Sequence, residues 1–177
     1  MEDRDLVRRL ADGDDRVIDE LVEKYKNPLY GFILRMVNDP EDAEDLFQET
    51  WIRVVRNRDR FRGDAKFSTW LFQIAVNLVR DLRRKGKGWT MVPIEDHENS
   101  LTCDPDVDPE RLINAQRIKT ILSELPEKMR EVMVLKYYHD LSEGEIAQIA
   151  GCPEGTVKSR VFRASKLLKT KWEKRYA

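Results

Sequence analysis

Apolar residues recur every three or four positions along most of this chain, and this spacing restricts its fold more than any other sequence feature. Val17, Leu21 and Tyr25 share one face of a predicted helix, and Leu122 and Leu125 share another later in the chain. This period is that of an amphipathic α-helix, whereas a half-buried strand requires strict alternation. The 177 residues include only eight glycines and seven prolines, which disfavours a turn-rich β fold. The sequence therefore predicts an all-α fold.

Cap residues and prolines set the expected helix limits in the first half of the chain. Asp39 followed by Pro40 suits an N-cap and the first position of a helix. Ser68 or Thr69 is expected to cap the next long helix. Pro28 falls inside an apolar repeat, so we expect it to distort its helix or to end the first half of that helix.

An acidic stretch with several prolines interrupts the helical pattern. Residues 93–110 contain seven acids and no base, and such a weakly periodic segment is typical of an extended linker. The predicted organisation is therefore two small helical domains, at 1–87 and 111–177, joined by a flexible acidic linker at 88–110. Within the second domain, Pro126 is expected to start a further helix.

Charged side chains nearly balance, with 32 Lys+Arg against 33 Asp+Glu, but they are segregated along the chain. Residues 39–49 carry six acids and no base. Residues 66–87 carry six bases and one acid, and residues 156–175 carry eight bases and one acid. Two basic surfaces separated by acidic ones indicate two points of contact with a polyanion. The alternative interpretation is a set of ordinary solvated helix faces.

The most informative motif lies in residues 141–168. Ser142 and Glu145 have the spacing of a capping box that opens a short helix. Gly151 then supplies a tight turn, and Pro153 suits the first position of the following helix. Two short helices joined by such a turn form a helix-turn-helix, so the second domain is predicted to contain one.

The second helix of this motif has two different sides. Val157, Val161, Ala164 and Leu168 recur on one side and are expected to pack inward. The other side is basic and suits the major groove of DNA, where Arg or Lys reaches guanine and an apolar group contacts a thymine methyl. The alternative is an ordinary amphipathic helix with a basic face. The residues expected to contact DNA, through bases or phosphates, are Thr156, Lys158, Ser159, Arg160, Phe162, Arg163 and Lys166.

An acidic amphipathic helix in the first domain presents four polar side chains close to one face. No histidine, glycine-rich loop or plausible nucleophile accompanies them in the sequence, so we expect a protein-docking or solvated face rather than a catalytic or metal site. These side chains are Asp42, Asp45, Gln48 and Glu49.

Aromatic residues surround the loop FRGDAKFSTW, and a basic helix follows it. Aromatic side chains beside a cationic groove suit single-stranded nucleic acid, because stacking one base contributes about 1–3 kcal/mol. Aromatic residues of a helical domain are more often part of its core, and this is the role expected for most of Trp70 and Phe72.

The chain resembles, over nearly its whole length, a bacterial sigma factor of the extracytoplasmic-function type, within the sigma-70 family. The resemblance rests on four strings in the order and spacing of that family: DAEDLFQETW, FRGDAKFSTWLFQIAVNLVRDLRRK, LPEKMREVMVLKYYHDLS and EIAQIAGCPEGTVKSRVFRA. It implies that residues 1–87 bind core RNA polymerase and recognise and melt the −10 promoter element. It also implies that residues 111–177 recognise the −35 element.

The resemblance further implies roles for individual residues and partners. The four polar residues of the acidic helix would bind the clamp helices of the largest polymerase subunit, and the second domain would contact the polymerase flap. An anti-sigma factor is the implied regulator. The residues implied in −10 recognition, including a loop that captures a flipped base, are Phe61, Arg62, Gly63, Asp64, Ala65, Lys66, Phe67, Asn77, Arg80 and Arg84.

Several classes of function are disfavoured by the sequence. We expect no catalytic residues, cofactor or metal, because no reactive groups converge. No long apolar segment or signal-peptide core is evident, which predicts a cytoplasmic protein without membrane insertion. Cys103 and Cys152 are expected to be idle thiols. The main alternative is a stand-alone helix-turn-helix regulator, and an adaptor with no nucleic-acid role comes after it.

Overall fold

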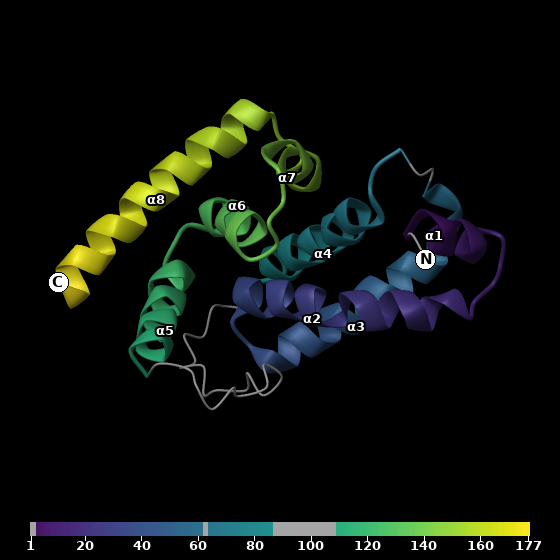
Figure 1. The fold of residues 1–177 in the computed structure, drawn as a ribbon, viewed down its shortest axis with the longest axis horizontal. Helices are drawn as coiled ribbons and strands as arrows, with labels where there is room; N and C mark the ends of the chain where they lie inside the picture. Colours follow the sequence, from purple (N-terminus) through teal and green to yellow (C-terminus); the bar gives the residue numbers. More distant parts are fainter. Residues whose placement is uncertain (1–2, 62–63, 87–108) are drawn as a thin grey trace.

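A computed structural model describes residues 3–61, 64–86 and 109–177 of the chain. Every regular element in these residues is helical, which confirms the predicted all-α fold. Most of the predicted linker, 88–108, lies outside the described residues. The elements, drawn in Figure 1, are α1 (Asp3–Ala11), α2 (Val17–Val37), α3 (Pro40–Arg56), η1 (Arg58–Arg60), α4 (Phe67–Arg84), α5 (Pro109–Ser123), α6 (Glu127–Tyr137), α7 (Glu143–Ala150) and α8 (Glu154–Tyr176).

Helices α1 to α4 pack around one apolar core. Leu21, Leu29 and Phe32 of α2 are completely buried, and Leu71 and Ala75 of α4 lie in the same core. Burial of a large apolar side chain contributes about 1.5–3 kcal/mol, so these side chains are the main source of stability in this half of the molecule.

Helix α2 continues through Pro28, so the expectation that the helix ends there is wrong. A proline removes only its own N–H from the helix ladder and crowds one preceding carbonyl. Tyr25 and Leu29 on either side of it are both buried. Their packing against the core holds the helix together across the missing hydrogen bond.

Of the two helix caps predicted in the first half of the chain, the one at Asp39 is confirmed. The Asp39 carboxylate accepts hydrogen bonds from the N–H groups of Glu41 (2.9 Å) and Asp42 (3.0 Å) at the start of α3. Helix α4, however, begins at Phe67, so neither Ser68 nor Thr69 caps it. The buried ring of Phe67 packs edge-on against Tyr25, with ring centroids 5.4 Å apart, and this contact fixes the start of α4 earlier.

Helices α5 to α8 bury apolar side chains of their own, which join the core cluster of the first four helices. Ile121 of α5, Leu125 just after it, Leu135 of α6 and Ile146 of α7 are all fully buried. Helix α6 begins directly after Pro126, as predicted. Helix α5 begins at Pro109, which lies inside the range predicted for the linker. The second group of helices thus starts two residues earlier than expected.

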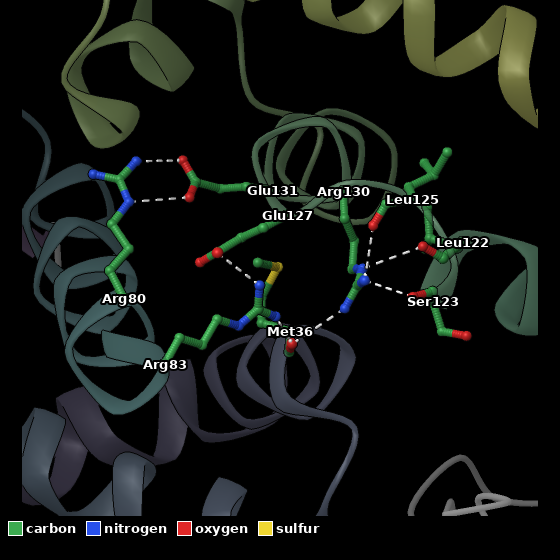
Figure 2. A network of polar contacts seen from close by, with 9 residues as sticks. All are labelled: Met36, Arg80, Arg83, Leu122, Ser123, Leu125, Glu127, Arg130 and Glu131. Atoms are coloured by element: carbon green, nitrogen blue, oxygen red, sulfur yellow. Dashed lines mark hydrogen bonds and ion pairs between the residues drawn. The ribbon is translucent and has the colours of Figure 1, made fainter. Parts of the chain in front are cut away.

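A buried arginine, Arg130 of α6, holds the end of α5. Its guanidinium donates to the carbonyls of Leu122 (3.2 Å), Leu125 (2.9 Å) and Ser123 (Figure 2). These carbonyls lie at and just beyond a helix end, where no further helical N–H can reach them. Burial lowers the pKa of Arg130, but an arginine guanidinium stays charged at neutral pH. The cation therefore serves as a C-terminal cap.

The two groups of helices also pack against one another. Helix α4 contacts α7, and α2 contacts α6. Helix α8 lies on the far side of α6 and α7 from the first group (Figure 1). The sequence predicts two helical domains joined by a flexible linker, and no pattern in it indicates this contact. Its polar part brings side chains of α4 against carboxylates of α6 and α7, as described below.

Candidate nucleic-acid interface

The predicted helix-turn-helix is formed by α7, a tight turn and α8. The Ser142 hydroxyl accepts from the N–H of Glu145 (3.3 Å), and the Glu145 carboxylate accepts from the N–H of Ser142 (2.9 Å), which confirms the capping box. Gly151 has a φ of 66°, a left-handed conformation that favours glycine. Pro153 was predicted at the first position of the next helix, but α8 begins at Glu154, so Pro153 is the residue just before it and makes no side-chain capping hydrogen bond. The short local signals in the sequence thus fix this motif.

Helix α8 has the two sides that the sequence predicts. Val157 and Ala164 are completely buried, and Val161 is nearly so. The phenyl ring of Phe162 lies on the opposite side with 71% of its surface exposed. A large exposed aromatic ring needs a partner to be stable, and here it stands among cations. We call the exposed residues of this side the outer face of α8: Lys158, Phe162, Arg163 and Lys166.

The other three residues of the predicted −35 set, Thr156, Ser159 and Arg160, are half-buried and not fully exposed. The half-buried Arg160 points back toward the turn, where its Nη1 lies 3.5 Å from the sulfur of Cys152. Ser159 is also half-buried and donates its hydroxyl to the carbonyl of Thr156 (3.0 Å). On the outer face itself, Lys158 lies 3.7 Å from the carboxylate of Glu143 in α7. The outer face therefore has fewer freely exposed cations than the sequence suggested.

Three of the four predicted polymerase-binding residues line one groove between α3 and α4. Asp45, Gln48 and Glu49 lie along it, together with the exposed side chain of Ile52 and, from α4, Leu82. Asp42 is half-buried in the first turn of α3 and does not line this groove. The lining of the groove thus combines carboxylates and apolar side chains with two cations, Arg53 and Lys85.

The aromatic loop before α4 encloses a hollow at the surface. The rings of Phe61 and Trp70 lie in contact at a tilt of 45°, with centroids 5.2 Å apart, whereas Phe67 is 2% exposed and belongs to the core. Arg62 and Gly63 lie outside the described residues. Residues of the loop and of α4 line the hollow, and one residue of α7, Gln148, joins them: the lining is Arg60, Phe61, Asp64, Ala65, Thr69, Trp70, Gln73 and Gln148.

The predicted −10 residues of α4 fall into two groups. Asn77 and Arg84 are exposed, and Arg84 pairs only with its helix neighbour Asp81. Arg80 instead faces the second domain, and its Nη2 lies 2.8 Å from a carboxylate oxygen of the buried Glu131 in α6. Arg80 is therefore engaged by a protein carboxylate.

Lys66, at the start of α4, is engaged in the same way. Its Nζ lies 2.7 Å from a carboxylate oxygen of Glu145 in α7. The hydrogen bond from Lys66, together with that from the Ser142 N–H, lowers the pKa of Glu145 to about 2. Burial has the opposite effect on Glu131 and raises its pKa, while Arg80 partly offsets that change. Both carboxylates lie on the helix-turn-helix side of the domain contact.

The described residues show no metal site and no membrane segment. Nowhere in the described ranges do three His, Cys, Asp or Glu side chains gather in a way that would hold a metal ion. Within the same ranges, none of the helices combines the length and apolar character that a membrane crossing requires.

Comparisons with known proteins connect these features. The family model "Sigma-70 region 2" matches residues 21–90, and "Sigma-70, region 4" matches residues 115–168. The chain is 36% identical to the RNA polymerase sigma-H factor of Pseudomonas aeruginosa, over 92% of this chain and 90% of that protein. It is 34% identical to the ECF RNA polymerase sigma factor SigW of Bacillus subtilis, over 92% of each chain.

A solved structure is similar over almost the whole length of both chains. CnrH, determined in complex with the cytosolic domain of CnrY, is 26% identical to this chain. The alignment covers 98% of each chain and has a TM-score of 0.75. The similarity therefore includes both groups of helices.

Proposed function

Because this chain belongs to the sigma-70 family of RNA polymerase factors, as a member of the extracytoplasmic-function type, we propose a division of promoter recognition between its two domains. The protein is a sigma factor, and its function is to direct RNA polymerase to promoters. In our proposal residues 1–87 bind core polymerase and melt the −10 element, and residues 111–177 recognise the −35 element. Residues 88–110 would connect them. The remaining proposals assign these roles to named side chains.

We assign −35 recognition to the outer face of α8. Arg163 and Lys166 are exposed there beside Phe162, and neither side chain has a hydrogen bond or ion pair with the described part of the chain. A helix with such a face fits the major groove, where a well-placed Arg discriminates one base pair by about 1–3 kcal/mol. Arg160 and Thr156 lie nearer the turn and would fix the position of the helix on the phosphates.

We assign core polymerase binding to the groove between α3 and α4. Its carboxylates, Asp45 and Glu49, and its exposed apolar residue Ile52 form a mixed surface typical of a protein interface. Asp42 would extend this surface at the first turn of α3. The clamp helices of the largest polymerase subunit are the proposed partner of this surface, and the flap is the proposed partner of the second domain.

We assign −10 melting to the aromatic hollow and the outer residues of α4. The tilted rings of Phe61 and Trp70 line a hollow in which an unpaired base would be held. Base capture of this kind offsets the unstacking free energy of a few kcal/mol. Asn77, Arg80 and Arg84 would contact the separated strand beyond the hollow, along one helix.

We also propose control by an anti-sigma factor. CnrH was solved with the cytosolic domain of CnrY, and this chain resembles it over both groups of helices. A partner that covers either the α3–α4 groove or the outer face of α8 would prevent initiation. Recovery of such a protein with the tagged chain from cells of its source organism, before any stress, would support this proposal.

The observation that carries the proposed function is the presence, in one chain, of an exposed basic face with an exposed aromatic ring on α8 and a separate groove lined by carboxylates on α3 and α4. A stand-alone regulator would need the first feature and not the second. Selection of genomic DNA fragments by the protein, with and without core polymerase, distinguishes the two. The sigma assignment predicts enrichment of promoter fragments only when polymerase is present. Equal enrichment of palindromic fragments without polymerase would favour the regulator.

A further inference from the structure

Three helices of the second domain meet at one carboxylate, that of Glu143. Glu143 is the first residue of α7. Its Oε1 lies 3.1 Å from Nζ of Lys136 in α6, and its Oε2 lies 3.7 Å from Nζ of Lys158 in α8. Each oxygen therefore faces a different lysine, and a single anion connects α6, α7 and α8.

The surroundings of the Glu143 carboxylate favour its ionised form. The hydrogen bond from Lys136 lowers the pKa of this carboxyl, and the charges of Lys136 and Lys158 act in the same direction. The start of a helix also favours an anion, because the free N–H groups of the first turn give it a partial positive charge. Glu143 is therefore negatively charged when the protein approaches DNA.

Stability alone does not account for the pair between Glu143 and Lys158. The Lys158 side chain is 62% exposed, and an ion pair with such an exposed partner contributes little to stability because water solvates both groups. An acid in the first turn of α7 also needs no lysine of the next helix to stabilise that turn. The main effect of the pair is therefore on where the Lys158 ammonium lies.

That location matters because Lys158 belongs to the outer face of α8. In a helix-turn-helix bound to DNA, the second helix enters the major groove while the first crosses the phosphate backbone. Glu143, on the first helix, would then lie at the edge of the groove. An acid in that place is repelled by phosphates, and Lys136 supplies a compensating positive charge from α6.

We propose that Glu143 is a positioning residue for −35 recognition, which holds the ammonium of Lys158 toward a base edge and keeps it from the phosphates. The inference rests on the proposed −35 role of the outer face of α8. A lysine ammonium has three N–H donors. Lys158 can therefore keep its contact with Glu143 while it donates to an acceptor of guanine in the groove.

The flexibility of lysine is the reason that Lys158 needs such a partner. Its ammonium is a point charge on a long, mobile stem. Without Glu143 it would pair with the nearest phosphate, and phosphate contacts carry no sequence information. Removal of the Glu143 charge should therefore raise the affinity for DNA of any sequence and lower the preference for one base pair. Loss of a purely structural contact would not give this combination.

Four variants of the full-length chain test this role. Glu143→Gln removes the charge and keeps the size of the side chain. Glu154→Gln is the matched control, because Glu154 is an exposed carboxylate of the same motif, in the first turn of α8. Lys158→Met removes the ammonium and keeps the apolar stem. The variant that combines Glu143→Gln with Lys158→Met completes a double-mutant cycle.

The probe is a pool of one promoter fragment, found by mapping start sites, in which only the −35 element is randomised. Each variant binds the pool together with core polymerase, and sequencing of bound and unbound DNA gives the preference at every base pair. Lys158→Met should lower the preference at one base pair about fivefold or more. Glu143→Gln should lower the same preference about threefold, because the lysine is still present but less restrained, and should raise the affinity for the whole pool. Glu154→Gln should leave every preference unchanged.

The outcomes separate this inference from the proposed function. In the Lys158→Met background, Glu143→Gln should change no preference further, and an additional change there would overturn the positioning role. Preferences of Glu143→Gln equal to those of the parent, with one base pair lost in Lys158→Met, would also overturn it and leave the −35 assignment intact. Unchanged preferences in both Lys158→Met and Arg163→Ala would overturn the −35 role of the outer face, and the inference with it. Circular dichroism melting establishes that each variant is folded.

Discussion

Arg80 of α4 and Glu131 of α6 meet across the boundary between the two domains, 51 positions apart in the sequence, through a forked ion pair with a closest distance of 2.8 Å. Arg80 is among the residues that the proposed function assigns to −10 DNA, so one guanidinium has two competing partners. Glu131 and a DNA phosphate would use the same nitrogens of this guanidinium, so the two contacts exclude one another.

The outer face of α8 is expected to determine promoter affinity without contributing to stability. Arg163→Ala should weaken binding of the polymerase holoenzyme to its −35 element by about 1–3 kcal/mol, the value of one base-reading arginine. Its thermal melting should not change, because the side chain is exposed. Ser165→Ala, an exposed change on the same helix, is the control. Gel-shift titration with holoenzyme measures the effect, and equal affinity of both variants would remove Arg163 from the interface.

The groove between α3 and α4 is expected to be needed for binding to core polymerase. Asp45→Lys reverses an exposed charge at its edge and should weaken the complex at least about tenfold, or 1.4 kcal/mol. Glu20→Lys makes the same change on the exposed side of α2 and should leave affinity intact. Fluorescence anisotropy of the labelled chain with core enzyme gives both values. A loss that is equal for the two variants would indicate a general charge effect.

The capping box at the start of α7 is expected to stabilise the helix-turn-helix. Ser142→Ala leaves the N–H of Glu145 without its side-chain acceptor and should lower the free energy of unfolding by about 1 kcal/mol. Ser142→Asp supplies an equivalent acceptor and should restore most of that loss. Urea titrations followed by circular dichroism compare the three proteins. Failure of the aspartate to restore stability would mean that the hydroxyl acts in some other way.

Acid is expected to weaken the domain contact through His139. Burial between the two domains, with a smaller effect from Arg35, lowers the pKa of His139 to about 4. In the unfolded chain a histidine has a pKa near 6.5, so the unfolded state binds the proton first as the pH falls. The free energy of unfolding should then decrease by as much as about 2 kcal/mol between about pH 7.5 and about pH 5.

His139→Phe should remove this acid-dependent loss, because a phenyl ring keeps the packing on Phe72 and does not titrate. The pKa of Glu131 shifts in the opposite direction to that of His139, because burial raises it. The raised pKa stabilises the folded state at low pH, and this stabilisation is lost as the pH rises through the pKa of Glu131 in the folded state. The difference between parent and variant cancels the Glu131 contribution. Parallel acid profiles for the two proteins would contradict the role given to His139.

The sequence predicted the features that depend on neighbouring residues. Asp39 with Pro40, Ser142 with Glu145, and Gly151 act within one helical turn, and the structure has each of them as predicted. The inward and outward sides of α8 followed from apolar spacing alone. Local chemistry is enough in such cases, because the groups that satisfy one another lie within a few positions.

The features that depend on distant residues were missed. Pro28 was expected to distort its helix or to end the first half of it, and the second alternative is wrong because the core that holds α2 on both sides of Pro28 cannot be read from its sequence neighbours. Phe67 was placed among DNA-contacting residues, and its packing on Tyr25 puts it in the core. The partner of Arg80 lies in another domain, where no period or spacing indicates it. A basic residue on a predicted helix has the same sequence signal whether it meets a phosphate or a glutamate.

Transcription by purified core polymerase on genomic fragments, with and without this protein, is the most direct test of the central claim. Mapping of the RNA 5′ ends should reveal new start sites that appear only when the protein is present. Those sites should share two elements, at the −35 and −10 positions, with a constant spacing between them. Active core polymerase that responds to a control sigma factor, yet gives no new start sites with this chain, would contradict the account.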